Sequence, residues 1–249
     1  MIAIPPLRRC SIEITSPRLR SGHASPPTRG VLLLYYGMPS RTYVYVDSFN
    51  LYYGCLKGTP YKWLDLNKLC QLYLPASRIE RIYYCTAIVS GTADDPDNHI
   101  RQRAYLRALQ TLPNIRIILG HFLSERIELP RADGNGSVAV IRSKEKGSDV
   151  NLVTALMWDA CEDNFDTAAI VSGDLDFVSP VKTVRDNYRK EIIVLDPQRK
   201  SGGKSKLYEV ASSSKPIRTS ALAASQFLNE LTDRDGRKIH KPPEWYVNP

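Results

Sequence analysis

The alternation of short apolar segments with longer helical stretches between Thr42 and Leu195 constrains the fold more than any other feature of the sequence. The short segments are rich in β-branched and aromatic residues, which favour strands; they are Tyr43–Val46, Arg81–Val89, Ile115–Leu119, Ala168–Val171 and Glu191–Leu195. The longer stretches carry apolar residues at helical spacing; they are Asp65–Leu74, 97–112, Ser148–Cys161 and Asp176–Tyr188. Strands and helices that alternate in this way form a parallel sheet covered on both faces. The sequence therefore predicts an α/β fold with a central, mostly parallel sheet.

One segment, Ser124–Arg142, departs from this alternation. It contains Asp133-Gly134-Asn135-Gly136, and Asp-Gly and Asn-Gly pairs are typical of tight turns between antiparallel strands. We therefore expect a β-hairpin insertion before the helix at Ser148–Cys161.

The two ends of the chain differ in composition from the part between them. Residues 1–40 are rich in Pro, Ser, Arg and Gly and have no helical or strand period, which is typical of a disordered leader. Met38 lies shortly before the first expected strand, and we predict that it is the natural start. Residues 41–197 are then the folded domain. Residues 198–249 are a C-terminal extension that packs on the domain or trails from it, with a short helix expected near Leu222–Leu231.

The composition favours a cytoplasmic protein with a polyanionic partner. The formal net charge is +8, and a positive field attracts nucleic acid. The five cysteines are scattered and form no CxxC pair, as expected for reduced thiols and not for a zinc site. No apolar run approaches the roughly 20 residues that span a bilayer, so we expect no membrane association. The sequence leaves the oligomeric state open between monomer and homodimer.

Aspartates follow two of the expected strands and begin one expected helix. Asp47 comes directly after the first strand, and Asp174 and Asp176 follow the fourth strand across a Ser-Gly step. Asp149 lies in the first turn of the helix that precedes the fourth strand. Functional groups in open parallel sheets collect at the carboxyl ends of the strands. If the first and fourth strands are neighbours, Asp47 and Asp174 emerge side by side and Asp149 can join them.

Such a cluster favours a metal ion. Carboxylates within a few ångströms of one another repel strongly at low dielectric constant, and a divalent cation between them removes this penalty. Donor sets made only of oxygen suit Mg²⁺ or Mn²⁺. An ion of this kind polarises a phosphodiester oxygen and lowers the pKa of an attacking water, so no side-chain nucleophile is needed.

Each aspartate also has a purely structural interpretation. Asp47 and Asn50 could cap a short helix, and Asp149 would be favoured by the helix macrodipole in any protein. Asp174 and Asp176 could be turn and cap residues. The occurrence of all these acids at strand ends and at one helix start favours the metal centre.

Three segments resemble the signature motifs of the NYN family of PIN-like nucleases, and within that family they resemble the LabA-like branch. They are Tyr45–Leu51, Lys146–Asp149 and Val171–Phe177. The resemblance implies a three-layer α/β/α sandwich with a PIN-like sheet over residues 41–197, a Mg²⁺ or Mn²⁺ site, and cleavage of RNA. It does not identify the RNA, and it leaves single-stranded DNA open as a substrate.

Carried over position by position, the resemblance implies a role for each residue of the motifs. Asp47, Asp149 and Asp174 match the metal-binding acids. Asn50 matches a polar residue that helps to orient metal or water, and Asp176 matches a second acid of the last motif. Position 175, where that motif often has a small polar residue, is a leucine.

Three further residues are candidates for binding the substrate. Lys144 and Lys146 lie in the loop that leads to Asp149 and could hold a phosphate. Ser172 could donate a hydrogen bond to a phosphate.

Two other functions remain open. A haloacid-dehalogenase-type phosphatase would use Asp174 and Asp176 as nucleophile and acid, but its strand should run directly into the first aspartate, and Asp47 would have no role. A PIN-like RNA-binding or regulatory module would keep the fold without turnover, although all the expected acids are present.

Overall fold

The computed structural model describes residues 39–92, 94–198 and 206–246. The predicted start at Met38 and all but the last two residues of the predicted leader lie outside these ranges.

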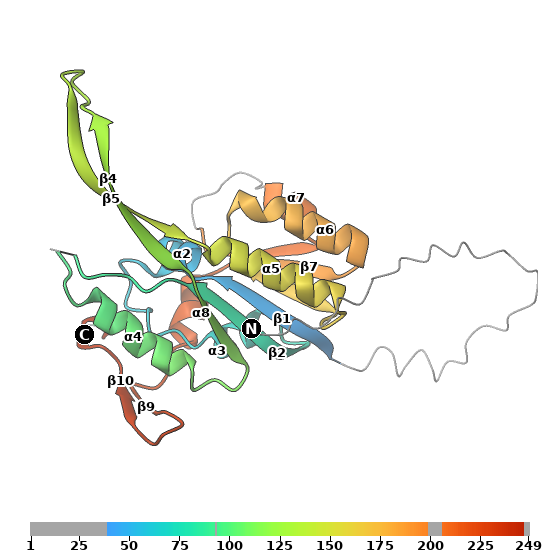
Figure 1. Cartoon of the computed structure of the whole chain (residues 1–249). Coiled ribbons are helices and arrows are strands. Elements are labelled where there is room, and N and C mark those ends of the chain that lie inside the picture. Colours follow the sequence, from blue (N-terminus) through green and yellow to red (C-terminus); the bar gives the residue numbers. More distant parts are fainter. Residues whose placement is uncertain (1–38, 93, 199–205, 247–249) are drawn as a thin grey trace, which may run out of the picture. The chain divides into compact units, whose positions relative to one another are not determined.

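Six strands form the main sheet: β1 (Ser40–Asp47), β2 (Ser77–Thr86), β3 (Ile115–Leu119), β6 (Thr167–Val171), β7 (Glu191–Asp196) and β8 (Ser213–Pro216). Their order is β3-β2-β1-β6-β7-β8, and every neighbouring pair is parallel (Figure 1). The prediction of a central parallel sheet is confirmed.

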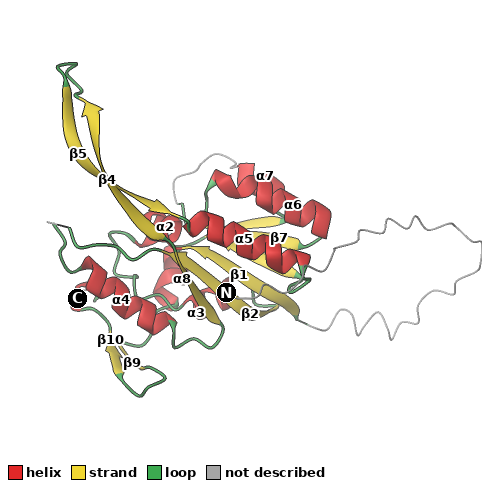
Figure 2. Cartoon of the chain, in the orientation of Figure 1, coloured by secondary structure: helices red, strands yellow, loops and turns green. Residues whose placement is uncertain are grey.

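Helices cover both faces of this sheet, which confirms the three-layer α/β/α arrangement (Figure 2). One face carries α3 (Leu66–Tyr73), α4 (Asn98–Leu109) and α8 (Thr219–Ala224), and the other carries α5 (Ser148–Cys161), α6 (Val178–Tyr188) and α7 (Lys206–Val210). Successive side chains of a strand point to opposite faces. In β1, Val44 and Val46 therefore pack in the first apolar cluster, whereas Tyr45 packs in the second. No helix in the described ranges combines the length and apolarity needed to cross a membrane.

The ends of two helices follow from local sequence. Asp65 caps α3, because its carboxylate accepts hydrogen bonds from the backbone N–H groups of Asn67 and Lys68 at 3.0 and 3.1 Å. Gly147 precedes α5 with φ of 95°, a left-handed conformation that glycine adopts without penalty. It lets the chain turn from a strand directly into the helix that carries Asp149.

The expected insertion is a β-hairpin, formed by β4 (His121–Pro130) and β5 (Ser137–Lys146). It is longer than predicted at both ends, and in Figure 1 it extends away from the helices that cover the sheet. Gly134 and Gly136 have φ of 76° and 80° in the connecting turn. At its base, the ring of Phe122 meets the ring of Phe49 edge-on at 5.9 Å.

The C-terminal part of the chain differs from the helix predicted near Leu222–Leu231. α8 ends at Ala224, and β9 (Glu230–Thr232) pairs with β10 (Lys238–His240). The predicted short helix is present but ends at Ala224 and not at Leu231. Beyond it the backbone bonds to another segment: Phe227 N–H donates to the Trp63 carbonyl at 3.0 Å, and Ser225 O accepts from Asp65 N–H at 2.7 Å. These bonds compete with continuation of the helix.

Candidate active site at the carboxyl edge of the sheet

β1 and β6 end side by side at the carboxyl edge of the sheet. Val46 is in register with Val171, so the residues that follow these two leave the sheet together. Asp47, at the end of β1, is 4% exposed. One of its oxygens accepts a hydrogen bond from Asn50 N–H at 3.0 Å and so caps α2 (Ser48–Leu51). The capping interpretation of Asp47 is therefore correct, and it leaves the second carboxylate oxygen for other partners.

A chain of hydrogen bonds ties the two strand ends together. Ser172 is fully buried, and its hydroxyl donates to the second carboxylate oxygen of Asp47 at 3.1 Å. The same hydroxyl accepts from Asp174 N–H at 3.1 Å. In a second link, the amide oxygen of Asn50 accepts from Gly173 N–H at 2.9 Å. Ser172 and Asn50 thus fix Asp47 relative to the loop that carries Asp174.

Asp174 and Asp176 begin the helical segment after β6. Asp174 accepts a hydrogen bond from Asp176 N–H at 3.0 Å and caps the 3-10 helix Leu175–Phe177, which leads into α6. Leu175 is 55% exposed. Its side chain therefore does not pack in the core, and the departure from the family motif at this position changes the surface of the site.

Asp149 reaches the site from the first turn of α5. Just before this helix, Glu145 of β5 accepts hydrogen bonds from the backbone N–H of Ser148, at 3.0 Å, and from its hydroxyl. The carboxylate of Glu145 interacts electrostatically with Asp149. Glu145 is thus a further acid of the site that sequence reasoning missed, because it lies at the end of an exposed hairpin strand and not after a buried one.

The acids interact as one electrostatic cluster. Burial raises the pKa of Asp149 to about 6, and the negative charges of Asp47, Asp174, Glu145 and Asp176 add to this. Burial also raises the pKa of Asp47, and the negative charge of Asp174 raises it further. The hydrogen bonds that Asp47 accepts lower its pKa and offset part of this effect. Raised carboxylate pKa values mean that the ionised forms are destabilised where they stand. Asp47, Asp149 and Asp174 thus interact electrostatically, and their role as metal ligands stays a prediction.

The donor chemistry of this cluster suits a hard divalent cation. All of its side chains offer carboxylate oxygen, and the mutual repulsion raises the pKa values that a cation would lower. Among the residues that the structure describes, no group of three or more His, Cys, Asp or Glu side chains is arranged so that it could hold a metal ion. Mg²⁺ fits such a site because it usually keeps several waters and needs only one or two carboxylates.

The structure gives weaker support to the residues predicted to bind phosphate. Lys144 and Lys146 are exposed residues of β5. Strand alternation places them on the face of the hairpin opposite to Glu145. Ser172 has its hydroxyl engaged by Asp47 and Asp174, which favours positioning of the acids over contact with a phosphate.

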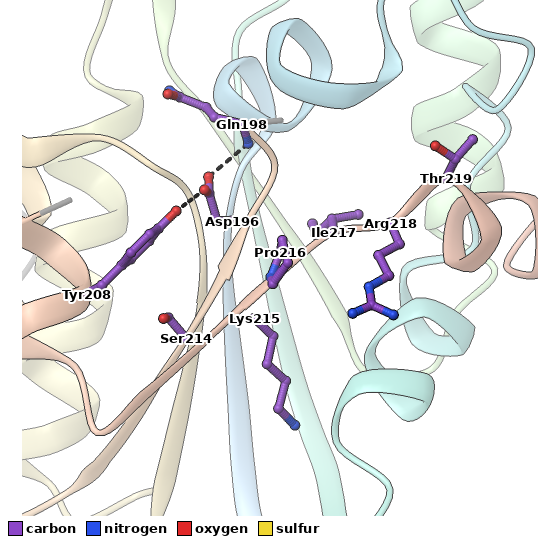
Figure 3. A pocket seen from close by; sticks show the side chains of 9 residues that line it. All are labelled: Asp196, Gln198, Tyr208, Ser214, Lys215, Pro216, Ile217, Arg218 and Thr219. Carbon is purple, nitrogen blue, oxygen red and sulfur yellow. Dashed lines mark hydrogen bonds between the residues drawn. The ribbon is translucent and has the colours of Figure 1, made fainter. Parts of the chain in front are cut away.

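A cavity of about 470 Å³ lies beside the end of β7, outside the acid cluster (Figure 3). Its acid, Asp196, accepts hydrogen bonds from Tyr208 Oη and, at 2.8 Å, from Gln198 N–H. None of Asp47, Asp149 and Asp174 lines this cavity. Because this cavity contains none of the three acids, the acid cluster and not the cavity is the candidate active site.

The chain is similar in sequence or in structure to several known proteins. The chain is 28% identical over 242 residues to a 6-hydroxy-3-succinoylpyridine 3-monooxygenase of Pseudomonas putida, with 85% of this chain and 77% of that protein covered. It resembles the crystal structure of a protein of unknown function from Vibrio parahaemolyticus with 19% identity and a TM-score of 0.49, over 74% of this chain and 96% of that one.

The family profile of the NYN domain matches residues 41–213, which include β1, α5, β6 and all the acids described above. The chain therefore belongs to the NYN domain family, whose members are in general PIN-like nucleases.

Proposed function

We propose that this protein is a metal-dependent ribonuclease of the LabA-like branch, and that it hydrolyses RNA phosphodiester bonds in the cytoplasm. The observation that carries the proposal is the electrostatic cluster of Asp47, Asp149 and Asp174, which come from three separate segments and meet at the carboxyl edge of the sheet. The net charge of +8 supports a polyanionic substrate.

In this mechanism Asp47, Asp149 and Asp174 would hold Mg²⁺ or Mn²⁺. When bound, the ion polarises the phosphodiester and lowers the pKa of the attacking water. Ser172 and Asn50 orient Asp47 through the hydrogen bonds that join the two strand ends. Asp176 and Glu145 extend the negative field around the site, and Lys144 and Lys146 attract RNA to the adjoining hairpin.

We further propose that residues 41–197 form the nuclease domain and that the extension from 198 onward packs on it. Support comes from the first apolar cluster, which contains side chains of the extension: Ile217, Leu222, Phe227, Ile239 and Trp245.

The test is cleavage of a 5′-labelled single-stranded RNA by wild type and by Asp174→Asn. With Mn²⁺ or Mg²⁺ the wild type is expected to cleave, and EDTA to abolish cleavage. Because a neutral amide is a much weaker cation ligand than a carboxylate, Asp174→Asn should lower the rate at least about a hundredfold. A single-stranded DNA of the same sequence shows whether cleavage requires ribose.

Asp186→Asn is the matched control, since Asp186 is an exposed aspartate of α6 that pairs with Arg185. It should cleave as the wild type does. A wild type that binds RNA and never cleaves it with either ion would instead identify a non-catalytic RNA-binding module. Equal rates for Asp174→Asn and wild type would contradict the proposed site.

A second function is suggested by the relative that is named a monooxygenase, because 85% of this chain aligns with it. Such an enzyme inserts one oxygen atom of O₂ into its substrate and reduces the other to water with two electrons from a donor. The test is oxygen uptake with 6-hydroxy-3-succinoylpyridine and a reduced nicotinamide nucleotide. Uptake that depends on this substrate, without cleavage of RNA, would favour the monooxygenase over the nuclease.

A further inference from the structure

A second cavity, of about 210 Å³, opens beside the acid cluster between α2, the π-helical turn Tyr52–Leu56, α4 and the C-terminal segment. Ser48 and Phe49, which directly follow Asp47, line it. Tyr84, near the end of β2, also lines it and interacts electrostatically with Asp47. The cavity and the acid cluster thus share the carboxyl edge of the sheet.

Aromatic rings make up much of the wall of this cavity. They belong to Phe49, Tyr52, Tyr53, Tyr84, Tyr105 and Trp245. Tyr52 and Tyr53 are 36% and 63% exposed and meet edge-on at 5.2 Å, so they stand at the mouth. Tyr105 and Trp245 are buried and meet edge-on at 6.3 Å. A lining of this kind favours a flat ring that can stack.

Most polar side chains of the cavity are already engaged. Arg101 pairs with Asp95 and Glu244. The side-chain amide of Gln102 accepts from Val89 N–H and donates to the Ala87 carbonyl, both at 2.9 Å. These groups have little capacity left for a ligand.

Polar groups without a hydrogen-bond partner among the described residues also line the cavity, and the hydroxyl of Ser48 is one of them. The amide oxygen of Asn98 is buried and has no donor. The ammonium group of Lys62 is half-buried and takes part in none of the ion pairs or hydrogen bonds of the described chain, and burial together with Arg101 lowers its pKa. Buried polar groups are nearly always paired. The cavity therefore presents an unused acceptor at Asn98 and an unused donor at Lys62, besides the hydroxyl of Ser48.

We propose that this cavity binds a flat ring with a cyclic amide edge, and that this ring is the nucleobase beside the cleaved phosphate. A carbonyl of the ring accepts from Lys62, the adjacent N–H donates to Asn98, and the ring faces stack on the tyrosines. This edge is present in uracil and guanine and absent from adenine and cytosine. The cavity is smaller than the roughly 300–1,000 Å³ of pockets for drug-sized ligands, which favours the single ring of uracil.

The nucleobase assignment rests on the proposed nuclease function, whereas the ring-binding site does not. A free heteroaromatic compound such as 2-pyridone carries the same carbonyl beside an N–H. The experiment therefore has one arm that measures binding of free rings and one that measures the position of cuts in RNA.

In the first arm, uracil, 2-pyridone and 1,3-dimethyluracil are titrated into the full chain and binding is followed by ligand-observed NMR. Uracil should bind at least about tenfold more tightly than 1,3-dimethyluracil, which has no N–H for Asn98. Lys62→Met and Asn98→Ala should each weaken uracil binding about tenfold. Lys182→Met, an exposed lysine of α6, should bind as the wild type does.

In the second arm, cuts in RNA of mixed sequence are mapped for wild type and Lys62→Met. Cuts beside uracil should be enriched for the wild type, and the share of cuts beside uracil should fall in Lys62→Met. Equal binding of uracil and 1,3-dimethyluracil, or no effect of Lys62→Met and Asn98→Ala, would overturn the ring site.

The two arms separate the two proposals. Cleavage that needs Asp174 but shows no base preference and no uracil binding would overturn the ring site and leave the nuclease standing. Binding of uracil and 2-pyridone without any cleavage of RNA would keep the ring site, overturn the nucleobase assignment, and identify a free heteroaromatic compound as the ligand.

Discussion

At the scale of single residues, the acid cluster shows how a capping residue can also be a site residue. Asp47 caps α2 with one oxygen and meets Ser172 with the other. Asp174 likewise caps a helical turn. The caps hold both carboxylates at the sheet edge, so the structural and functional interpretations of these aspartates are compatible.

We expect Ser172→Ala to weaken cation binding without unfolding the protein. The variant removes the hydroxyl that donates to Asp47 and accepts from Asp174 N–H. A hydrogen bond to a charged group contributes about 1.5–3 kcal/mol, so Mn²⁺ affinity, measured by calorimetry, should fall about tenfold. Ser179→Ala, at an exposed serine of α6, is the control. Unchanged affinity in Ser172→Ala would contradict the positioning role.

We expect Asp149→Asn to stabilise the metal-free protein at neutral pH. The pKa of Asp149 is raised from 3.8 to about 6 in the native state. The native state therefore keeps a proton that the unfolded chain loses near pH 4. The contribution of this group to stability falls as the pH rises from about 4 to about 6, and it stays low above that window.

Thermal melts in EDTA test this expectation. Asp149→Asn should melt above the wild type at about pH 7.5 and together with it at about pH 4. Asp186→Asn is again the control, and its effect should have the opposite sign, because Arg185 lowers the pKa of Asp186. If Asp149→Asn instead melts below the wild type at neutral pH, the ionised carboxylate of Asp149 stabilises the native state, and the prediction is wrong.

At the scale of secondary-structure elements, the hairpin is the part of the fold that depends least on the core. Its apolar residues Leu129, Val138 and Ile141 are exposed, at 43%, 47% and 81%. None of them belongs to either apolar cluster. The ring contact of Phe122 with Phe49 ties the base of the hairpin to α2.

Shortening this hairpin should therefore leave the domain folded. Arg126 is paired with Ile141, so residues 127–140 can be replaced by Asn-Gly, which closes antiparallel strands with a two-residue turn. We expect the melting temperature to change by no more than about 4 °C, since this corresponds to less than about 1 kcal/mol. A loss of cooperative unfolding would show that the arm packs on the domain.

The elements that sequence predicted well are those with a buried face. β3 and α5 have the predicted bounds, and the other core strands differ by a few residues at their ends. β8 was missed because its four residues are polar and exposed, at the edge of the sheet. The helix expected near Leu222–Leu231 ends at Ala224 because the peptide groups beyond it bond to a distant segment, which no local pattern records.

Part of the candidate site could also be predicted from the sequence. The order of the strands places Asp47 beside the loop of Asp174, and two motifs were enough to expect this. Glu145 and the cavity at Lys62 depend on how the hairpin base and α4 pack against α2, and these contacts join residues far apart in the sequence.

At the scale of the whole molecule, the C-terminal segment is part of the core. β8 pairs with β7, and Phe227 and Trp245 contact the ring of Trp63, at 5.9 and 6.1 Å between centroids. The family profile ends at residue 213, before most of these contacts.

A chain that ends at Ser213 should therefore fail to fold cooperatively. It loses five buried apolar side chains from the first cluster, each worth about 1.5–3 kcal/mol. Their sum is comparable with the roughly 5–15 kcal/mol by which domains are stable. Near-UV circular dichroism and thermal melts, compared with a chain that ends at Tyr246, provide the measurement. Cooperative unfolding of the shorter chain would show that residues 41–213 are self-sufficient.

The two occupied oxygens of Asp47 have a consequence for ion selectivity. Each already accepts a hydrogen bond, so about two of the four lone-pair positions of this carboxylate remain for an incoming ion. Ca²⁺ seeks six to eight oxygen ligands, whereas Mg²⁺ gives up its hydration water reluctantly. A carboxylate that keeps about half of its acceptor positions should discriminate against the larger, more demanding ion and admit the one that arrives with most of its hydration shell intact.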